Sequence, residues 1–275
     1  MNNKQDISKF ISLENAIPAL AGNGWRSSVR RVLENLLGIT AVRQVVTDAS
    51  VSNSQDIFSR SLEILDILVD SKGVPEAIKS LPKNSGAIII ANHPFGGADA
   101  IALCSLCAKH RPDDSKILAN SVVYHAPKFP QYLLPLKILG EPNAARHNLK
   151  TLKTASEHVN NGGLLGVFPA GGVSHYQPDQ QKVTDVAWSE HIARIALKTQ
   201  VPVIPVKFFG RNPLWYQLIG RINPLLRAAM IPRALLIMKH KTIKCRAGAV
   251  ISPATLAKEE HPTTFLRNAV YSIPE

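Results

Sequence analysis

The residues best suited to chemistry lie in one short segment, Asn92-His93-Pro94-Phe95-Gly96-Gly97-Ala98-Asp99. An aliphatic run, Ala87–Ala91, precedes it, and a run with helical character, Ala100–His110, follows it. This order predicts a strand that brings His93 to its carboxyl end, a turn made by two glycines, and an aspartate near the start of a helix. Ligands bind at the carboxyl ends of strands in open α/β sheets. A histidine beside a carboxylate is the common apparatus for taking a proton from a hydroxyl group. His93 and Asp99 are therefore the candidate catalytic residues.

The same segment allows a purely structural interpretation. Asp99 would then be only the N-cap of the following helix, and His93 a polar residue with satisfied hydrogen bonds at the end of a strand. A His-x5-Asp spacing alone arises by chance. The strand, the glycine pair and the helix around it favour the catalytic interpretation.

Two other segments carry unusual residues. Phe168-Pro169-Ala170-Gly171-Gly172 follows an apolar run, and its glycines let the backbone approach a ligand and offer N–H groups to an anion. An ordinary turn would have the same composition. Arg146, in a segment that opens a helix, is placed to bind a phosphate or carboxylate, although a solvated arginine is the simpler interpretation.

The remaining pattern predicts the fold class. From about residue 74, short apolar runs alternate with helical patterns, which is typical of an α/β fold with a mixed, largely parallel sheet flanked by helices. Residues 1–75 show helical spacing instead, so we expect an N-terminal helical region at 1–75 and an α/β domain at 76–275. Strands are expected at 86–91, 116–120, 164–168, 201–209 and 241–251, and helices at 26–37, 55–69, 100–110, 148–159 and 186–198.

The three cysteines, Cys104, Cys107 and Cys245, are too few for a disulfide framework. Cys104 and Cys107 would lie on one face of a helix, which favours core packing over a metal or redox site, and no metal is expected. Residues 1–6 lack the pattern of a signal peptide, and no run of 18 apolar residues predicts a transmembrane helix. Attachment to one face of a membrane is still compatible with this composition.

Positive charge is concentrated in one part of the chain. The net charge is +12, and no Asp or Glu occurs between His191 and Ala257, a stretch that holds eleven Lys and Arg residues. Such a stretch implies an anionic partner, namely lipid headgroups, an acidic carrier protein or nucleic acid, unless the protein is simply basic overall. No nucleic-acid-binding signature accompanies it, so we expect no nucleic acid partner.

Together these motifs resemble the glycerolipid acyltransferase superfamily. The resemblance rests on Asn-His-Pro-Phe-Gly-Gly-x-Asp at 92–99, Phe-Pro-Ala-Gly at 168–171 and Val-Pro-Val-Ile-Pro-Val at 201–206. It covers residues 84–252 and includes Thr184-Asp185-Val186-Ala187-Trp188. Within the superfamily the chain is most similar to the haemolysin-like branch, which includes lyso-ornithine lipid acyltransferases.

The resemblance implies an O-acyltransferase that moves a fatty acyl group from acyl-carrier protein or acyl-CoA to a lysolipid hydroxyl. His93 would be the general base and Asp99 would orient it, with no cofactor beyond the thioester co-substrate. By position, Arg146 would hold the acceptor's polar head. The segment Phe168, Pro169, Gly171 and Gly172 would help to bind the acceptor.

The chain departs from the superfamily pattern in two places. The usual spacing is His-x4-Asp, and His-x5-Asp is that of the haemolysin-like branch. The third block usually carries a glutamate, whereas positions 170 and 172 are Ala and Gly here. The alternative is therefore a relative with impaired catalysis that binds lipids or acts as a scaffold.

A membrane partner would also suit residues 212–236, where apolar side chains alternate with Arg221, Arg227 and Arg233. Apolar surface beside cations is typical of a protein at an anionic membrane interface. A buried helical hairpin with arginines reaching solvent would give the same pattern. The first interpretation places the protein at the cytoplasmic face of the membrane, with its basic stretch largely on one face.

Overall fold

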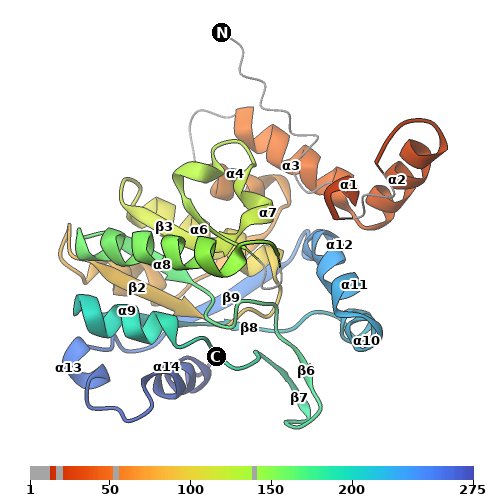
Figure 1. Cartoon of the computed structure of the whole chain (residues 1–275). Helices are drawn as coiled ribbons and strands as arrows, with labels where there is room; N and C mark the ends of the chain where they lie inside the picture. The colour runs from red at the N-terminus through yellow and green to blue at the C-terminus, as the bar shows by residue number, and fades with distance from the viewer. Residues whose placement is uncertain (1–12, 17–20, 52–55, 138–140) are drawn as a thin grey trace.

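The computed structural model describes residues 13–16, 21–51, 56–137 and 141–275, and its centre is a seven-stranded sheet covered by helices (Figure 1). Every neighbouring pair of strands is parallel except β8 and β9, which confirms the mixed, largely parallel sheet. The strand order is β1 (Leu68–Asp70), β9 (Thr242–Ala247), β8 (Val203–Phe209), β2 (Ala87–Ala91), β5 (Leu164–Val167), β3 (Ser115–Asn120) and β4 (Leu133–Leu136).

The central strand β2 shows why this sequence forms a sheet buried on both faces. Ile88 and Ile90 belong to one hydrophobic cluster, and Ala87, Ile89 and Ala91 belong to the other, so alternate side chains point to opposite faces. All five residues have no exposed surface. A parallel strand between two helical layers needs such a continuous apolar run, and each buried isoleucine contributes about 1.5–3 kcal/mol to folding.

The helices form two layers. α3 (Ile39–Val51), α4 (Ile57–Ile64), α5 (Val74–Lys79), α6 (Gly97–His110) and α12 (Ile231–Ile237) pack on one face of the sheet. α8 (Ala144–Asn160), α9 (His191–Thr199), α13 (Pro253–Leu256) and α14 (Pro262–Tyr271) pack on the other. The remaining described elements are α1 (Leu13–Ala16), α2 (Trp25–Leu36), α7 (Ser121–Tyr124), η3 (Phe129–Gln131), β6 (His175–Gln177), β7 (Lys182–Thr184), α10 (Leu214–Ile222) and α11 (Pro224–Ala229).

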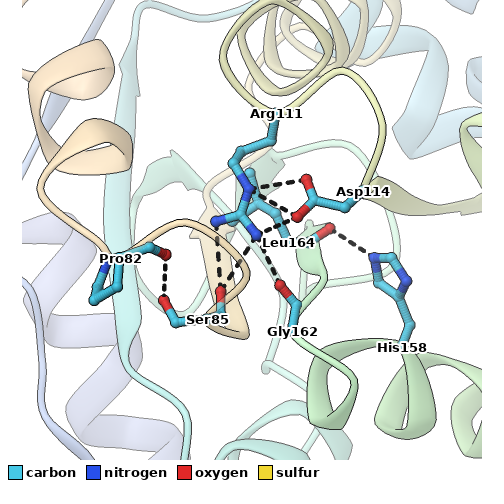
Figure 2. Close-up of polar contacts among 7 residues, drawn as sticks. All are labelled: Pro82, Ser85, Arg111, Asp114, His158, Gly162 and Leu164. Atoms are coloured by element: carbon cyan, nitrogen blue, oxygen red, sulfur yellow. Dashed lines mark hydrogen bonds and ion pairs between the residues drawn. The ribbon is translucent and has the colours of Figure 1, made fainter.

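Arg111, at the end of α6, stabilises the side of the sheet where the parallel strands start, which we call the amino edge (Figure 2). Its guanidinium group donates to both carboxylate oxygens of Asp114, to the Ser85 carbonyl at 3.3 Å and to the Gly162 carbonyl at 2.7 Å. Ser85, Asp114 and Gly162 lie just before β2, β3 and β5. Arg111 therefore ties together the starts of three parallel strands.

The N-terminal region contains the predicted helices and one strand that the sequence did not reveal. The single helix expected at 55–69 is wrong in extent, because α4 ends at Ile64 and Leu68–Asp70 forms β1. Asp66 between them has a φ of 50°, which interrupts the helix, and β1 pairs with β9 at the edge of the sheet. α3 and α4 share a hydrophobic cluster with α6, while the boundary at residue 75 stays a prediction. The first residues, expected to carry no leader, lie outside the described ranges.

Among the described residues, no helix combines the length and the apolar character that a membrane crossing requires. Cys104, Cys107 and Cys245 are free thiols buried in the core, which confirms the core packing that their spacing predicted for Cys104 and Cys107. Burial raises the pKa of the Cys107 thiol to about 12.

Candidate active site

Asn92 fixes the chain where it leaves β2. Its side-chain amide donates to the Phe208 carbonyl at 2.9 Å, and its amide oxygen accepts from the Phe208 N–H at 2.7 Å. The side chain thereby continues the pairing of β2 with β8 one residue beyond the last strand residue. The next residue, His93, is held at the carboxyl end of the central strand, where the sequence predicted it.

The structure brings His93 and Asp99 together. His93 Nδ1 lies 3.2 Å from Asp99 Oδ1, and Asp99 is completely buried in the first turn of α6. The carboxylate accepts from the Phe95 N–H and the Ala100 N–H, both at 2.9 Å. The N-cap of α6 is Gly96, so the interpretation of Asp99 as only an N-cap is wrong. His93 Nδ1 is close enough for an ion pair but not aligned for a hydrogen bond, and such contacts often tighten only when substrate binds.

The glycine turn between these residues is required by its surroundings. Gly96 has a φ of 83°, and a Cβ there would stand 2.8 Å from the Val173 side chain. The backbone can therefore turn from the strand into α6 only with glycine at this position. This close approach also places the His93 loop against the segment that follows β5.

Phe168, from that segment, stacks on His93 with 4.0 Å between ring centroids and 27° between planes. Phe168 and Pro169 are buried, whereas Gly171 and Gly172 form an exposed tip. The Gly171 N–H is already used, because it donates to the Phe168 carbonyl at 3.0 Å. The predicted segment thus meets His93 through the Phe168 ring, and the glycine tip extends away into solvent.

Asp185 is a second buried carboxylate that makes hydrogen bonds to the segments around His93. It accepts from the His93 backbone N–H at 3.3 Å, from Trp188 Nε1 at 2.9 Å and from the Ser174 hydroxyl. Its own N–H donates to the Tyr271 hydroxyl oxygen at 3.0 Å. Asp185 therefore ties the His93 loop to the segment after β5 and to α14. Our sequence interpretation noted Asp185 in a motif and gave it no role.

The charges around His93 favour its protonated form. Burial lowers the pKa of His93, but the charge of Asp99, its contact with the ring and the more distant charge of Asp185 outweigh burial and hold the pKa above 6.5. The side chain keeps 14% of its surface exposed. The site can accept a proton and stabilise the resulting imidazolium, which is what a general base requires.

Arg146 lies near the start of α8. It is exposed on α8 and lines a groove of about 560 Å³ between α8 and α9, together with Lys150 and Lys198. No contact described for the resolved ranges joins it to His93 or Asp99, and its predicted role with the acceptor stays a prediction.

The basic stretch 191–257 is divided rather than on one face, which corrects our expectation. α9 and α10–α12 occupy opposite sides of the molecule in Figure 1. Lys207, Lys244 and Arg246 lie in the sheet between them, where they bond to the Tyr271 carbonyl, Glu275 and Asp70. The acid-free stretch therefore contributes cations to three separate parts of the fold.

The segment at 212–236 combines both interpretations that its sequence allowed. On α10 and α11 large apolar side chains are exposed, whereas Pro232, Ala234 and Leu235 of α12 are buried. The exposed side chains are Leu214, Leu218, Ile222, Leu225 and Leu226, with 50–81% of their surface accessible. We call these five residues the apolar strip.

The chain is similar in sequence to known acyltransferases. The acyltransferase family model matches residues 75–208. The lyso-glycine lipid O-acyltransferase of Phocaeicola vulgatus is 25% identical over 276 residues, which cover 96% of this chain and 95% of the relative. A protein of the same name from Bacteroides thetaiotaomicron is 25% identical over 227 residues, 79% of each chain. The solved 1-acyl-sn-glycerophosphate acyltransferase of Thermotoga maritima aligns with a TM-score of 0.48 at 19% identity, over 88% of this chain and 94% of that one.

Proposed function

We propose that the chain is a member of the glycerolipid acyltransferase superfamily and that it transfers a fatty acyl group from a thioester donor to the hydroxyl group of a lysolipid. The single observation that carries this proposal is the buried Asp99 carboxylate 3.2 Å from His93 Nδ1, at the carboxyl end of the central strand.

The reaction that this geometry supports is a direct transfer. His93 Nε2 accepts the proton of the acceptor hydroxyl while the hydroxyl oxygen attacks the thioester carbonyl carbon. The carbon–sulfur bond then breaks, and the departing thiolate takes the proton back from the imidazolium. Asp99 stabilises that imidazolium and keeps Nδ1 pointing inward. Because the hydroxyl oxygen attacks the thioester directly, no acyl-enzyme is needed.

The acceptor and the location follow from separate observations. Two relatives act, by name, on lyso-glycine lipid, which makes that lipid the first acceptor to test, with lyso-ornithine lipid second. The apolar strip beside Arg221 suits an anionic membrane surface, which we propose to be the cytoplasmic face. Either acyl-CoA or acyl-carrier protein is compatible with the chemistry at His93.

The test is acyl transfer from labelled acyl-CoA and acyl-carrier protein to these lysolipids, with His93→Ala as the critical variant. Loss of the general base lowers turnover by about 10²–10⁴-fold. His240→Ala is the matched control, because His240 forms a 2.7 Å pair with Asp66 that is exposed on the surface. An unchanged rate in His93→Ala would refute the assignment of the base.

The alternative, a lipid-binding relative with impaired catalysis, predicts a different result. The exposed tip at Gly171 and Gly172 carries no carboxylate, which is the observation that favours it. Wild-type protein would then bind lysolipid vesicles but transfer no acyl chain from either donor.

A further inference from the structure

The groove between α8 and α9 is a concave surface lined by both cations and apolar side chains. Its apolar residues are Leu149, Leu152 and Ile195, and 70% of the surface of Leu149 is exposed. Five cations line the walls: Arg146, Lys150 and Lys153 from α8, and Arg194 and Lys198 from α9.

The cations follow the spacing of a helix surface. Arg146, Lys150 and Lys153 occur at intervals of four and three residues, and Arg194 and Lys198 are four apart. Residues at these intervals share one face of a helix, so each wall carries a row of positive charge. The row on α8 extends about 10 Å along the helix axis.

Part of this charge is already balanced. Glu157 lies 3.8 Å from Lys153, and Glu190 pairs with Arg194. Arg146, Lys150 and Lys198 have no ion pair within the described ranges, and all three are exposed. An external anion can therefore reach these three cations.

The end of the groove at His191 adjoins the candidate active site. α9 begins at His191, which lines the groove, and two residues earlier the Ser189 N–H donates to the Pro169 carbonyl at 3.0 Å. Pro169 follows Phe168, the residue stacked on His93. A chain that leaves the groove at this end thus needs to pass only one packed segment to reach His93.

We propose that this groove docks an acidic helix of the carrier protein that presents the acyl thioester, an inference that rests on the proposed acyl transfer. An acidic amphipathic helix has carboxylates at the same four- and three-residue intervals, and its apolar side can pack on Leu149, Leu152 and Ile195. Arg146 then belongs to the donor side of the reaction rather than to the acceptor's head.

The shape of the surface favours a protein over the other anionic partners. A bilayer is flat and cannot enter a groove between two helices, and the exposed apolar strip on α10 and α11 suits it better. A nucleotide diphosphate is compact, whereas the cations are spread along two helices. Two parallel rows of charge flanking apolar side chains match a helix lying along the groove.

The experiment reverses two of these unpaired cations together, in the full-length variant Lys150→Glu, Lys198→Glu, and leaves Arg146 in place. A matched control reverses Lys109 and Lys258 to Glu, which are also exposed and lie outside the groove. Each variant is assayed with palmitoyl-loaded acyl-carrier protein, with palmitoyl-CoA and with palmitoyl-pantetheine, a donor without protein or nucleotide, and its binding to anionic phospholipid vesicles is measured. Binding of the carrier protein is also measured directly by calorimetry.

We expect the groove variant to raise the KM for the loaded carrier protein by about tenfold or more, in a salt-dependent way. Its turnover with palmitoyl-pantetheine should equal that of wild type, and the control should match wild type with both donors. Equal carrier binding by wild type and the groove variant would overturn the proposal. So would an effect confined to acyl-CoA or to anionic vesicles. If no donor gives product, the proposed acyl transfer fails, and calorimetry still decides whether the groove binds the carrier.

Discussion

The amino edge of the sheet and the opposite carboxyl edge, where the parallel strands end, each hold a buried ionic group. The two groups differ in how completely their hydrogen bonds are satisfied. At the amino edge Arg111 donates to Asp114 and to two carbonyls, so its guanidinium group is surrounded by acceptors (Figure 2). At the carboxyl edge His93 Nδ1 lies beside Asp99 without an aligned hydrogen bond. A saturated network rigidifies the fold, whereas an incompletely satisfied buried group marks a place where local stability is subordinate to function.

The comparison predicts that the carboxyl-edge pair controls activity. Asp99→Asn should lower turnover by about 10²–10⁴-fold, because the imidazolium loses its stabilising charge. The pKa of His93 should fall, since burial would act with less opposition. A general base works in its neutral form, so the acidic limb of the rate profile should move to lower pH. The measurement is kcat/KM against pH for wild type and variant, and a limb that stays in place would contradict the pairing.

The amino edge should behave in the opposite way. Arg111→Met removes the guanidinium group and leaves the Ser85 and Gly162 carbonyls without their donor, and each buried acceptor left unsatisfied costs about 1–3 kcal/mol. Urea unfolding measures the loss. Arg60→Met is the control, because the Arg60–Glu63 pair is exposed and contributes less than about 1 kcal/mol. Turnover of folded Arg111→Met should be that of wild type, and a large fall in turnover would abolish the distinction between the edges.

The sequence predicted the parts of this arrangement that are local. β2, the glycine turn and the start of α6 are consecutive, so the short segment around His93 was enough to predict the meeting of His93 with Asp99. The fold class followed from alternating runs in the same way. Each of these inferences needed only the periodicity of neighbouring residues.

What the sequence did not predict depends on distant partners. Asp185 contacts the His93 backbone across 92 positions and Tyr271 across 86, and no spacing rule connects them. The short strand β1 is stabilised by pairing with β9, far along the chain. Arg146 was placed by motif position alone, and its actual neighbours on α9 come from a separate segment.

Substitution of Asp185 tests whether the carboxyl edge also depends on a carboxylate whose hydrogen bonds are satisfied. Asp185→Asn replaces an acceptor oxygen by a donor facing Trp188 Nε1, Ser174 or His93, and such a mismatch costs about 1–3 kcal/mol of stability. The acidic limb of the rate profile should shift in the same direction as in Asp99→Asn, because Asp185 also raises the pKa of His93. A loss of stability without any shift in that limb would make Asp185 purely structural.

The smallest expected effect is a difference in stability between alanine substitutions at two adjacent glycines, at the tip beside Phe168. Gly171 has a φ of 66°, and Gly172 does not have a positive φ, although a Cβ at either position would meet no atom within 4 Å. Gly171→Ala should therefore cost about 1 kcal/mol through backbone strain alone, and Gly172→Ala should be near neutral. Thermal unfolding of the two variants measures the difference. Because the tip is exposed and only Phe168 touches His93, we expect neither change to alter kcat by more than about twofold, which corresponds to less than about 0.5 kcal/mol in the barrier. A large loss of kcat in Gly172→Ala, with stability unchanged, would show that the tip contacts the reacting lipid and would extend the functional part of the carboxyl edge beyond His93 and Asp99.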